Sequence, residues 1–176
     1  MNICVFGAAS DKLDPAYFLL AEELGRSMAR RGHGLVFGGG ATGLMGAVAR
    51  GVAAEGGTIL GVAPRFFDIP GVLVDSQYMV FTETMAERKT IMRHRSDAFI
   101  ALPGGIGTYE EFLETLTLRQ LGRHEKPIAL LETRGYYQNM ETMLRHTVEA
   151  GFMNENCLEM YRLFDDVETC LAYLEE

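Results

Sequence analysis

Short apolar runs alternate along the chain with longer stretches in which apolar residues recur every three or four positions. The short runs predict buried strands, and the longer stretches predict amphipathic helices. The chain opens in the order strand, helix, strand, helix, strand, which is typical of parallel strands joined by helices on both faces of the sheet. Strands are expected at residues 2–6, 34–37, 58–62, 77–81, 97–101, 127–131 and, as an edge strand, 161–164.

Helix start and stop signals bound the stretches between these strands. Asp14 is an expected N-cap, Pro15 follows at the first helical position, and Gly32 ends that helix after about residue 31. Further helices are expected at about 44–55, 84–95, 108–121, 138–150 and 167–174. Residues 66–75 show no regular pattern and are expected to form a lid or a surface loop.

These elements predict one doubly wound, Rossmann-like α/β domain over residues 1–176. Its mostly parallel sheet should have about six or seven strands, with helices on both faces. Ligands bind such sheets outside the carboxyl ends of the strands. The loops 7–10, 38–43 and 103–108 all follow predicted strands, so we expect them to gather at one edge and form a pocket.

The loop at 103–108 has the strongest chemical signal. Three glycines stand between the end of a strand and the start of a helix, where they permit positive φ angles and close approach of a ligand. The N-terminus of the following helix attracts an anion, most often a phosphate. The loops contribute these candidate substrate-binding residues: Ser10, Gly39, Gly40, Thr42, Gly43, Gly104, Gly105, Ile106, Gly107 and Thr108.

Structural explanations compete with these assignments. Thr108-x-x-Glu111 also matches a capping box, although a capping box does not require the three glycines that precede it. The glycines at 38–43 formally match the dinucleotide fingerprint. However, they follow the second strand, and no acidic residue stands after the next strand, so NAD is not expected. Tight packing of strand on helix explains any single one of these glycines equally well.

Composition restricts the compartment and the partners. The chain is 48% hydrophobic, has no apolar run of the ~18 residues that span a bilayer, and begins without a leader pattern, so we expect a cytoplasmic protein with no membrane partner. A net charge of −8 disfavours nucleic acid as a partner. Cys4, Cys157 and Cys170 lack metal-ligand spacing and are expected to be buried free thiols, with no metal bound.

Against the acidic background a basic island stands out, formed by Arg88, Lys89, Arg93 and Arg95. Such an island suits a small anionic ligand focused into a cleft. A solvated helix face is the alternative, and the pattern favours it for Lys89 and Arg95. Arg88 shares a helix face with Met85 and Met92, where an arginine more often covers apolar surface with its stem than contacts a ligand.

Several sequence blocks are similar to those of the LONELY GUY (LOG) family, long labelled lysine decarboxylase. The first is Pro103-Gly104-Gly105-x-Gly107-Thr108-x-x-Glu111. The others follow the family's order: Gly38-Gly39-Gly40-x-x-Gly43-Leu44-Met45-Gly46, Met85-x-Glu87-Arg88-Lys89, Gln120-Leu121-Gly122 and Lys126-Pro127. The resemblance spans about Ile3 to Tyr137, and it departs at Ala86 and Leu118, where many members have histidine and tryptophan.

The resemblance implies hydrolysis of the N-glycosidic bond of a nucleoside 5′-monophosphate to free base and ribose 5-phosphate. The implied substrates are N6-modified adenosine monophosphates, cleaved by a homodimer without cofactor or metal. Cleavage builds positive charge on the sugar, which a carboxylate can stabilise or can use to activate water. The resemblance implies Glu111 as this carboxylate and Arg88 as its partner in positioning substrate, with Glu110 in support.

The remaining candidates concern the base and the anion. Met85, Leu44 and Met45 either line the base site or fill the core, and Lys89 joins Met85 in the substrate-binding set.

Two other functions compete with this one. Decarboxylation with pyridoxal phosphate needs a Schiff-base lysine, and the only lysines are Lys12, Lys89 and Lys126, none with a cofactor signature around it. A non-catalytic carrier of nucleotides or of molybdenum cofactor, with a similar fold, is the alternative. A carrier does not need both Arg88 and Glu111, so their joint presence favours the hydrolase.

Overall fold

The computed structural model describes residues 1–74 and 78–176. Within these residues one sheet has seven strands, all parallel, in the order β4-β3-β2-β1-β5-β6-β7. The strands are β1 (Asn2–Phe6), β2 (Gly34–Phe37), β3 (Ile59–Pro64), β4 (Met79–Thr82), β5 (Ala98–Ala101), β6 (Ile128–Leu131) and β7 (Arg162–Phe164). The predicted parallel sheet is confirmed. The predicted start of the fourth strand at Gln77, and the end of the irregular segment at Asp75, lie outside the described residues.

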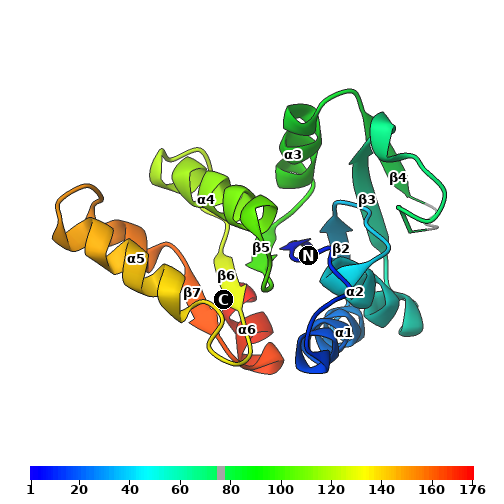
Figure 1. Cartoon of the computed structure of the whole chain (residues 1–176), viewed down its shortest axis with the longest axis horizontal. Coiled ribbons are helices and arrows are strands. Elements are labelled where there is room, and N and C mark those ends of the chain that lie inside the picture. Colours follow the sequence, from blue (N-terminus) through cyan, green and yellow to red (C-terminus); the bar gives the residue numbers. More distant parts are fainter. Residues whose placement is uncertain (75–77) are drawn as a thin grey trace.

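Helices cover both faces of the sheet, as the alternating pattern predicts. They are α1 (Pro15–Arg30), α2 (Gly43–Ala54), α3 (Met85–His94), α4 (Ile106–Gln120), α5 (Gln138–Glu149) and α6 (Val167–Leu174), with short 3-10 helices η1 (Arg65–Phe67) and η2 (Glu155–Glu159). Figure 1 shows α1, α2 and α6 on one side and α3, α4 and α5 on the other. Each side has its own apolar core against the sheet.

The direction of the strand order reverses at β1, which has β2 on one side and β5 on the other. A crevice at the carboxyl ends of the strands is expected at such a point. The three small-residue loops meet there, as the sequence predicts. The Ala8 N–H donates to the Pro103 carbonyl at 3.0 Å, and the Leu44 N–H donates to the Ala8 carbonyl at 2.8 Å.

The helix α4 begins two residues before the expected start near Thr108, and this shift rules out the capping box. The helix begins at Ile106, with Gly105 as an extended N-cap that has no side chain to offer, so Thr108 and Glu111 lie inside the helix and do not cap it. A capping arrangement forms instead at α3. There the Thr84 hydroxyl accepts from the Glu87 N–H at 3.1 Å, and the Glu87 carboxylate accepts from the Glu83 N–H at 3.0 Å.

The segment after β3 folds back over the loop that follows β2. It contains η1, which the sequence pattern did not predict, and then pairs antiparallel with residues 39–41. The Ala41 N–H donates to the Val72 carbonyl at 3.0 Å, and the Val74 N–H donates to the Gly39 carbonyl at 2.8 Å. This segment therefore borders the crevice.

Two expectations about the whole chain can be compared with the structure. Cys4, Cys157 and Cys170 are buried free thiols, as predicted. Across residues 1–74 and 78–176, no helix combines the length and the apolar character needed to cross a membrane.

Candidate active site

A cleft of about 250 Å³ lies at the crevice beside β1. Its walls come from the ends of β1 and β2, from α2, α3 and α4, and from the segment after β3. The large apolar side chains that line it are Val5, Phe6, Met45, Phe67, Val72, Leu73 and Met92. Arg88 and Glu111 are the charged residues among those that line it. The two predicted catalytic residues therefore face one apolar cleft.

Arg88 is fixed from three sides. Its Nε donates to the Val62 carbonyl at 3.1 Å, and its Nη1 lies 3.3 Å from Glu111 Oε1. A Cβ at Gly38 would fall 1.9 Å from Arg88 Nη2, so only glycine at that position leaves room for the guanidinium. The side chain is 12% exposed, which fits neither a solvated helix face nor a snorkelling arginine. Gly38 was absent from the residues predicted to form the site, because its partner is distant in sequence.

Glu111 is largely, but not fully, buried beside this guanidinium, with 13% of its side chain exposed. Burial raises the pKa of the Glu111 carboxyl above its ordinary value, and the nearby Arg88 charge opposes that rise only in part. A carboxyl with a raised pKa in a cleft is suited to acid–base work or to stabilising a developing positive charge.

Lys89 does not lie on a solvated face, contrary to the expectation from charge pattern. Its side chain is 18% exposed, and its Nζ pairs with Glu110 and, at 2.8 Å, with Glu114. Burial pulls the pKa of Lys89 down, but the hydrogen bonds to both carboxylates raise it overall. Arg93 Nη1 lies 3.1 Å from Glu114 on the same side of α4. Arg95 is exposed, as predicted.

The N-terminus of α4 faces open space. The N–H groups of its first turn have no partner within the helix. A Cβ at Gly105 or at Gly107 would meet nothing within 4 Å, whereas a Cβ at Gly104 would fall 2.0 Å from Thr108 Oγ1. Gly104 is therefore required for packing, and Gly105 and Gly107 leave room for a ligand. The Ile106 side chain points outward, with 87% of it exposed.

The N-terminus of α2 is already occupied by the chain itself. The Gly43 N–H donates to the Asp11 carboxylate at 2.8 Å, and the Thr42 hydroxyl donates to the Ala9 carbonyl at 2.8 Å. An internal carboxylate thus takes the place of an anion at this helix. Of the two glycine loops, the one before α4 is the better phosphate site.

Only some of the other candidates line the cleft. Gly40 and Thr42 line it, while Gly39 is buried at a φ of 79° beneath Leu73 and Met79. The Ser10 hydroxyl accepts from the Lys12 N–H at 3.1 Å. Met85 is 40% exposed and Leu44 is fully buried, so Leu44 belongs to the core and Met45 to the cleft wall.

A larger hollow of about 670 Å³ runs along α2 and the start of β3. Its lining among the described residues is mostly of small residues, with Arg50 and Tyr78 as the ionisable side chains. The residues described as lining it include no carboxylate, whereas the smaller cleft brings Glu111 and Arg88 together, so the smaller cleft is the candidate site.

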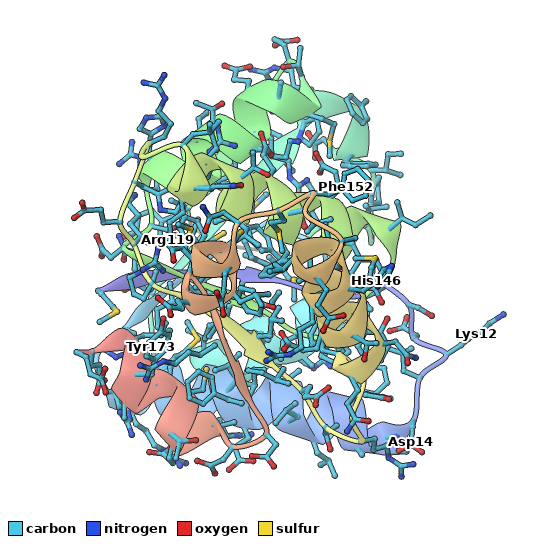
Figure 2. All side chains as sticks on the ribbon, turned by 90° about the vertical axis from the view of Figure 1, so that its left-hand side faces the viewer. Lys12, Asp14, Arg119, His146, Phe152 and Tyr173 are labelled. Atoms are coloured by element: carbon cyan, nitrogen blue, oxygen red, sulfur yellow. The ribbon has the colours of Figure 1, made fainter. Side chains whose placement is uncertain are left out.

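None of the three lysines lines the cleft. Lys12 projects away from the body of the molecule (Figure 2). Lys89 is held by the two carboxylates described above, and Lys126 Nζ donates to the Arg93 carbonyl at 2.7 Å. A Schiff-base lysine is therefore missing from the place where the chemistry would occur.

The chain matches known proteins along most of its length. The family described as "possible lysine decarboxylase" matches residues 45–174. LOG7 of Arabidopsis thaliana, a cytokinin riboside 5′-monophosphate phosphoribohydrolase, is 42% identical over 178 residues, which cover 99% of this chain and 81% of LOG7. LOGL3 of Oryza sativa subsp. japonica, a probable enzyme of the same name, is 38% identical over 174 residues, which cover 98% and 82%.

Solved structures share the fold at lower identity. The molybdenum cofactor binding protein of Rippkaea orientalis superposes with a TM-score of 0.76 at 22% identity, covering 99% of this chain and 94% of that one. The molybdenum cofactor carrier protein of Chlamydomonas reinhardtii gives 0.73 at 24% identity, with 99% and 95% covered. At these identities the likeness concerns the fold alone.

Proposed function

Because this chain belongs to the LOG family, whose curated relatives are cytokinin riboside 5′-monophosphate phosphoribohydrolases, we propose that it hydrolyses the N-glycosidic bond of adenosine 5′-monophosphates, N6-modified ones included. The products are the free base and ribose 5-phosphate. The substrate phosphate binds at the N-terminus of α4, where Gly105 and Gly107 leave open space beside unpaired N–H groups.

The position of Glu111 relative to this phosphate site supports the proposal. Glu111 is five residues after Ile106, which places it roughly 7.5 Å further along α4 by the helical rise per residue. A ribose ring bound between the phosphate and Glu111 brings its anomeric carbon towards the carboxylate. As the bond to the base breaks, positive charge develops on the ribose, and the Glu111 carboxylate stabilises it or takes a proton from the attacking water.

One observation carries the proposal: the buried pair of Arg88 and Glu111, 3.3 Å apart in an apolar cleft. A buried ion pair is weak evidence for stability, because desolvation offsets much of the attraction. Its position at the ligand edge of the sheet is better explained by function. Arg88 holds Glu111 and the substrate oxygens in place, and the surrounding apolar residues exclude water from the developing charge.

A non-catalytic carrier is the second candidate, since two of the structural neighbours bind or carry molybdenum cofactor. The likeness to them supports only the fold. A carrier has no use for a carboxylate buried against a guanidinium at the reacting end of the cleft, so the Arg88–Glu111 pair favours the hydrolase.

The proposal extends to assembly and compartment. We propose a homodimer, in which a second copy covers apolar side chains exposed near the cleft, such as Phe67, Met85 and Ile106. Sedimentation at micromolar concentration tests it, and a monomer would contradict it.

A cytoplasmic location is consistent with three unpaired cysteines, because reducing compartments keep thiols free. Cell fractionation tests that location.

The activity is tested by incubating the protein with AMP, with isopentenyladenosine monophosphate, and with the two corresponding nucleosides, and by measuring released base. We expect release from the monophosphates and far slower release from the nucleosides, because the phosphate supplies charge-assisted backbone contacts. Equal kcat/KM for AMP and adenosine would contradict the proposed role of the phosphate in binding. No base release from any of the four would favour the carrier.

A further inference from the structure

Tyrosine hydroxyls hold the loop that precedes α4 from behind. The Tyr136 hydroxyl donates to the Gly104 carbonyl at 2.6 Å, and the Tyr137 hydroxyl donates to the Leu102 carbonyl at 2.6 Å. The Tyr109 hydroxyl in turn donates to the Tyr136 oxygen at 3.1 Å. The Tyr136 and Tyr137 phenols therefore each fix the direction of one peptide group in the Leu102–Gly105 turn.

The segment that carries these phenols is itself fixed. Arg134 and Gly135 both have positive φ angles, 62° and 69°, and turn the chain back beneath the loop. The buried Glu132 carboxylate accepts from the Tyr137 N–H. Tyr136 packs edge-on against Tyr17 at 6.1 Å between ring centroids. The Tyr136 hydroxyl is thus held in place independently of any ligand.

Because the peptide bond is planar, the hydrogen bond from Tyr136 to the Gly104 carbonyl also fixes the direction of the Gly105 N–H. In a trans peptide the carbonyl and the following N–H point in opposite directions. Tyr136 holds the Gly104 carbonyl toward the protein, so the Gly105 N–H points away from it. Within residues 1–74 and 78–176, nothing accepts a hydrogen bond from this N–H, and a Cβ at Gly105 would meet open space.

We propose that Tyr136 is a positioning residue for the substrate phosphate, because its hydroxyl holds the Gly104–Gly105 peptide with the Gly105 N–H facing the anion. The inference rests on the proposed phosphate site at α4. A peptide between two glycines needs such an anchor, since no side chain opposes its rotation. Burial, with the hydrogen bond from Tyr109, raises the pKa of Tyr136 to about 12, which keeps the hydroxyl a donor at ordinary pH.

Tyr137 provides a matched control. It makes the same kind of bond to the Leu102 carbonyl, but the next residue is Pro103, which has no N–H. Tyr137→Phe therefore removes a buried phenol–carbonyl bond from the same loop without releasing a donor. It should lower the melting temperature and leave phosphate recognition intact.

The test compares calorimetric binding of AMP and of adenosine to the wild type, Tyr136→Phe and Tyr137→Phe. For Tyr136→Phe we expect AMP affinity to fall about tenfold, the scale of a charge-assisted hydrogen bond, with adenosine affinity unchanged. In ¹⁵N spectra, the Gly105 amide should move on addition of AMP in the wild type and much less in this variant. For Tyr137→Phe we expect AMP affinity to change by less than about threefold.

Each contrary result has a distinct meaning. If the wild type prefers AMP and Tyr136→Phe keeps that preference, the positioning role is overturned and the proposed function stands. Equal losses for AMP and adenosine would make Tyr136 merely structural. If the wild type has no preference for AMP, the phosphate site itself is wrong and this inference falls with it. Tyr109→Phe, which leaves the Tyr136 hydroxyl in place, should shift affinity in the same direction by less, and provides a second variant should Tyr136→Phe not fold.

Discussion

The guanidinium of Arg88 lies against the backbone of Gly38, so closely that a Cβ there would fall 1.9 Å from Nη2. Gly38, which directly follows β2, and Arg88 of α3 thus determine together where the positive charge of the cleft lies. Glycine at this position serves packing against a functional group, a use distinct from the flexible turn or phosphate loop that a Gly-Gly-Gly run suggests.

Gly38→Ala should displace this guanidinium. We expect kcat/KM for AMP to fall at least about tenfold, because a misplaced positioning group commonly weakens catalysis that much or more. Gly34→Ala, at the opposite end of β2, is the control. Its Cβ would meet mainly the flexible Asn2 amide at 2.7 Å, far from the cleft, so activity should persist. Equal activity in both variants would show that the Arg88–Gly38 contact has no role.

Arg88→Lys tests the geometry of the charge. A guanidinium bonds the Val62 carbonyl and Glu111 at once, whereas an ammonium is a point charge on a flexible stem. We expect at least a tenfold loss of rate, equivalent to roughly 1.4 kcal/mol of barrier, with little change in melting temperature. A fully active lysine variant would show that Arg88 has only a packing role.

Glu111→Gln separates charge from shape. Since Glu111 does not cap α4, glutamine should leave the fold intact, and loss of the carboxylate should lower the rate about a hundred- to a thousandfold. Glu110→Gln is the matched control. Glu110 is 53% exposed and pairs with Lys89 away from the cleft, so its loss should be much milder. Base release and AMP affinity measure both variants, and wild-type turnover in Glu111→Gln would end the proposed mechanism.

The raised pKa of Glu111 predicts a pH-dependent stability difference. Below the ordinary pKa of about 4.3 the group is protonated in both states, and above its raised folded-state pKa the buried carboxylate disfavours folding. The wild type should therefore lose stability relative to Glu111→Gln as pH rises through this window. Urea unfolding at pH 4 and pH 7 measures the difference. A gain in wild-type stability relative to Glu111→Gln as pH rises would contradict the assignment. The acid limb of the pH profile of kcat/KM should likewise have its midpoint above about 4.3.

Gly107→Ala should exchange function for stability. Alanine in a helix is favoured over glycine by about 0.5–1 kcal/mol, and its Cβ would meet no protein atom within 4 Å. We expect a higher melting temperature with weaker AMP binding, since the methyl group enters the space left for the phosphate. Gly104→Ala, which collides with Thr108, should instead lose stability. If Gly107→Ala binds AMP as tightly as the wild type, the phosphate must bind at another place.

Much of this arrangement follows from sequence because parallel sheets obey general rules. Once β1, β2 and β5 are recognised as buried apolar runs, the loops after them must share an edge, and the Ala8–Pro103 and Leu44–Ala8 hydrogen bonds confirm that they do. Arg88 and Glu111 were predicted as a pair from resemblance, and the structure places them 3.3 Å apart.

The expectations that fail depend on contacts between distant segments, which a local sequence pattern does not reveal. Thr84-x-x-Glu87 and Thr108-x-x-Glu111 have the same spacing, yet only the first caps a helix, because α4 has already begun at Ile106. Lys89 looked solvated because its carboxylate partners belong to another helix. The filling of the α2 terminus by Asp11, and the fit of Arg88 to Gly38, are likewise tertiary contacts between segments distant in sequence.

The central place of β1 in the sheet has a consequence for the order in which the molecule can be made. One edge of β1 pairs with β2 early, but the other edge pairs Ile3 with Ala98. At a synthesis rate of about 5–20 residues per second, the backbone groups of that second edge wait roughly 5 to 20 s for their partner on the ribosome. Arg88 is made within that interval, and Glu111 only after it. The first half of the nascent chain therefore holds an open strand edge, which must be shielded from other chains until β5 emerges.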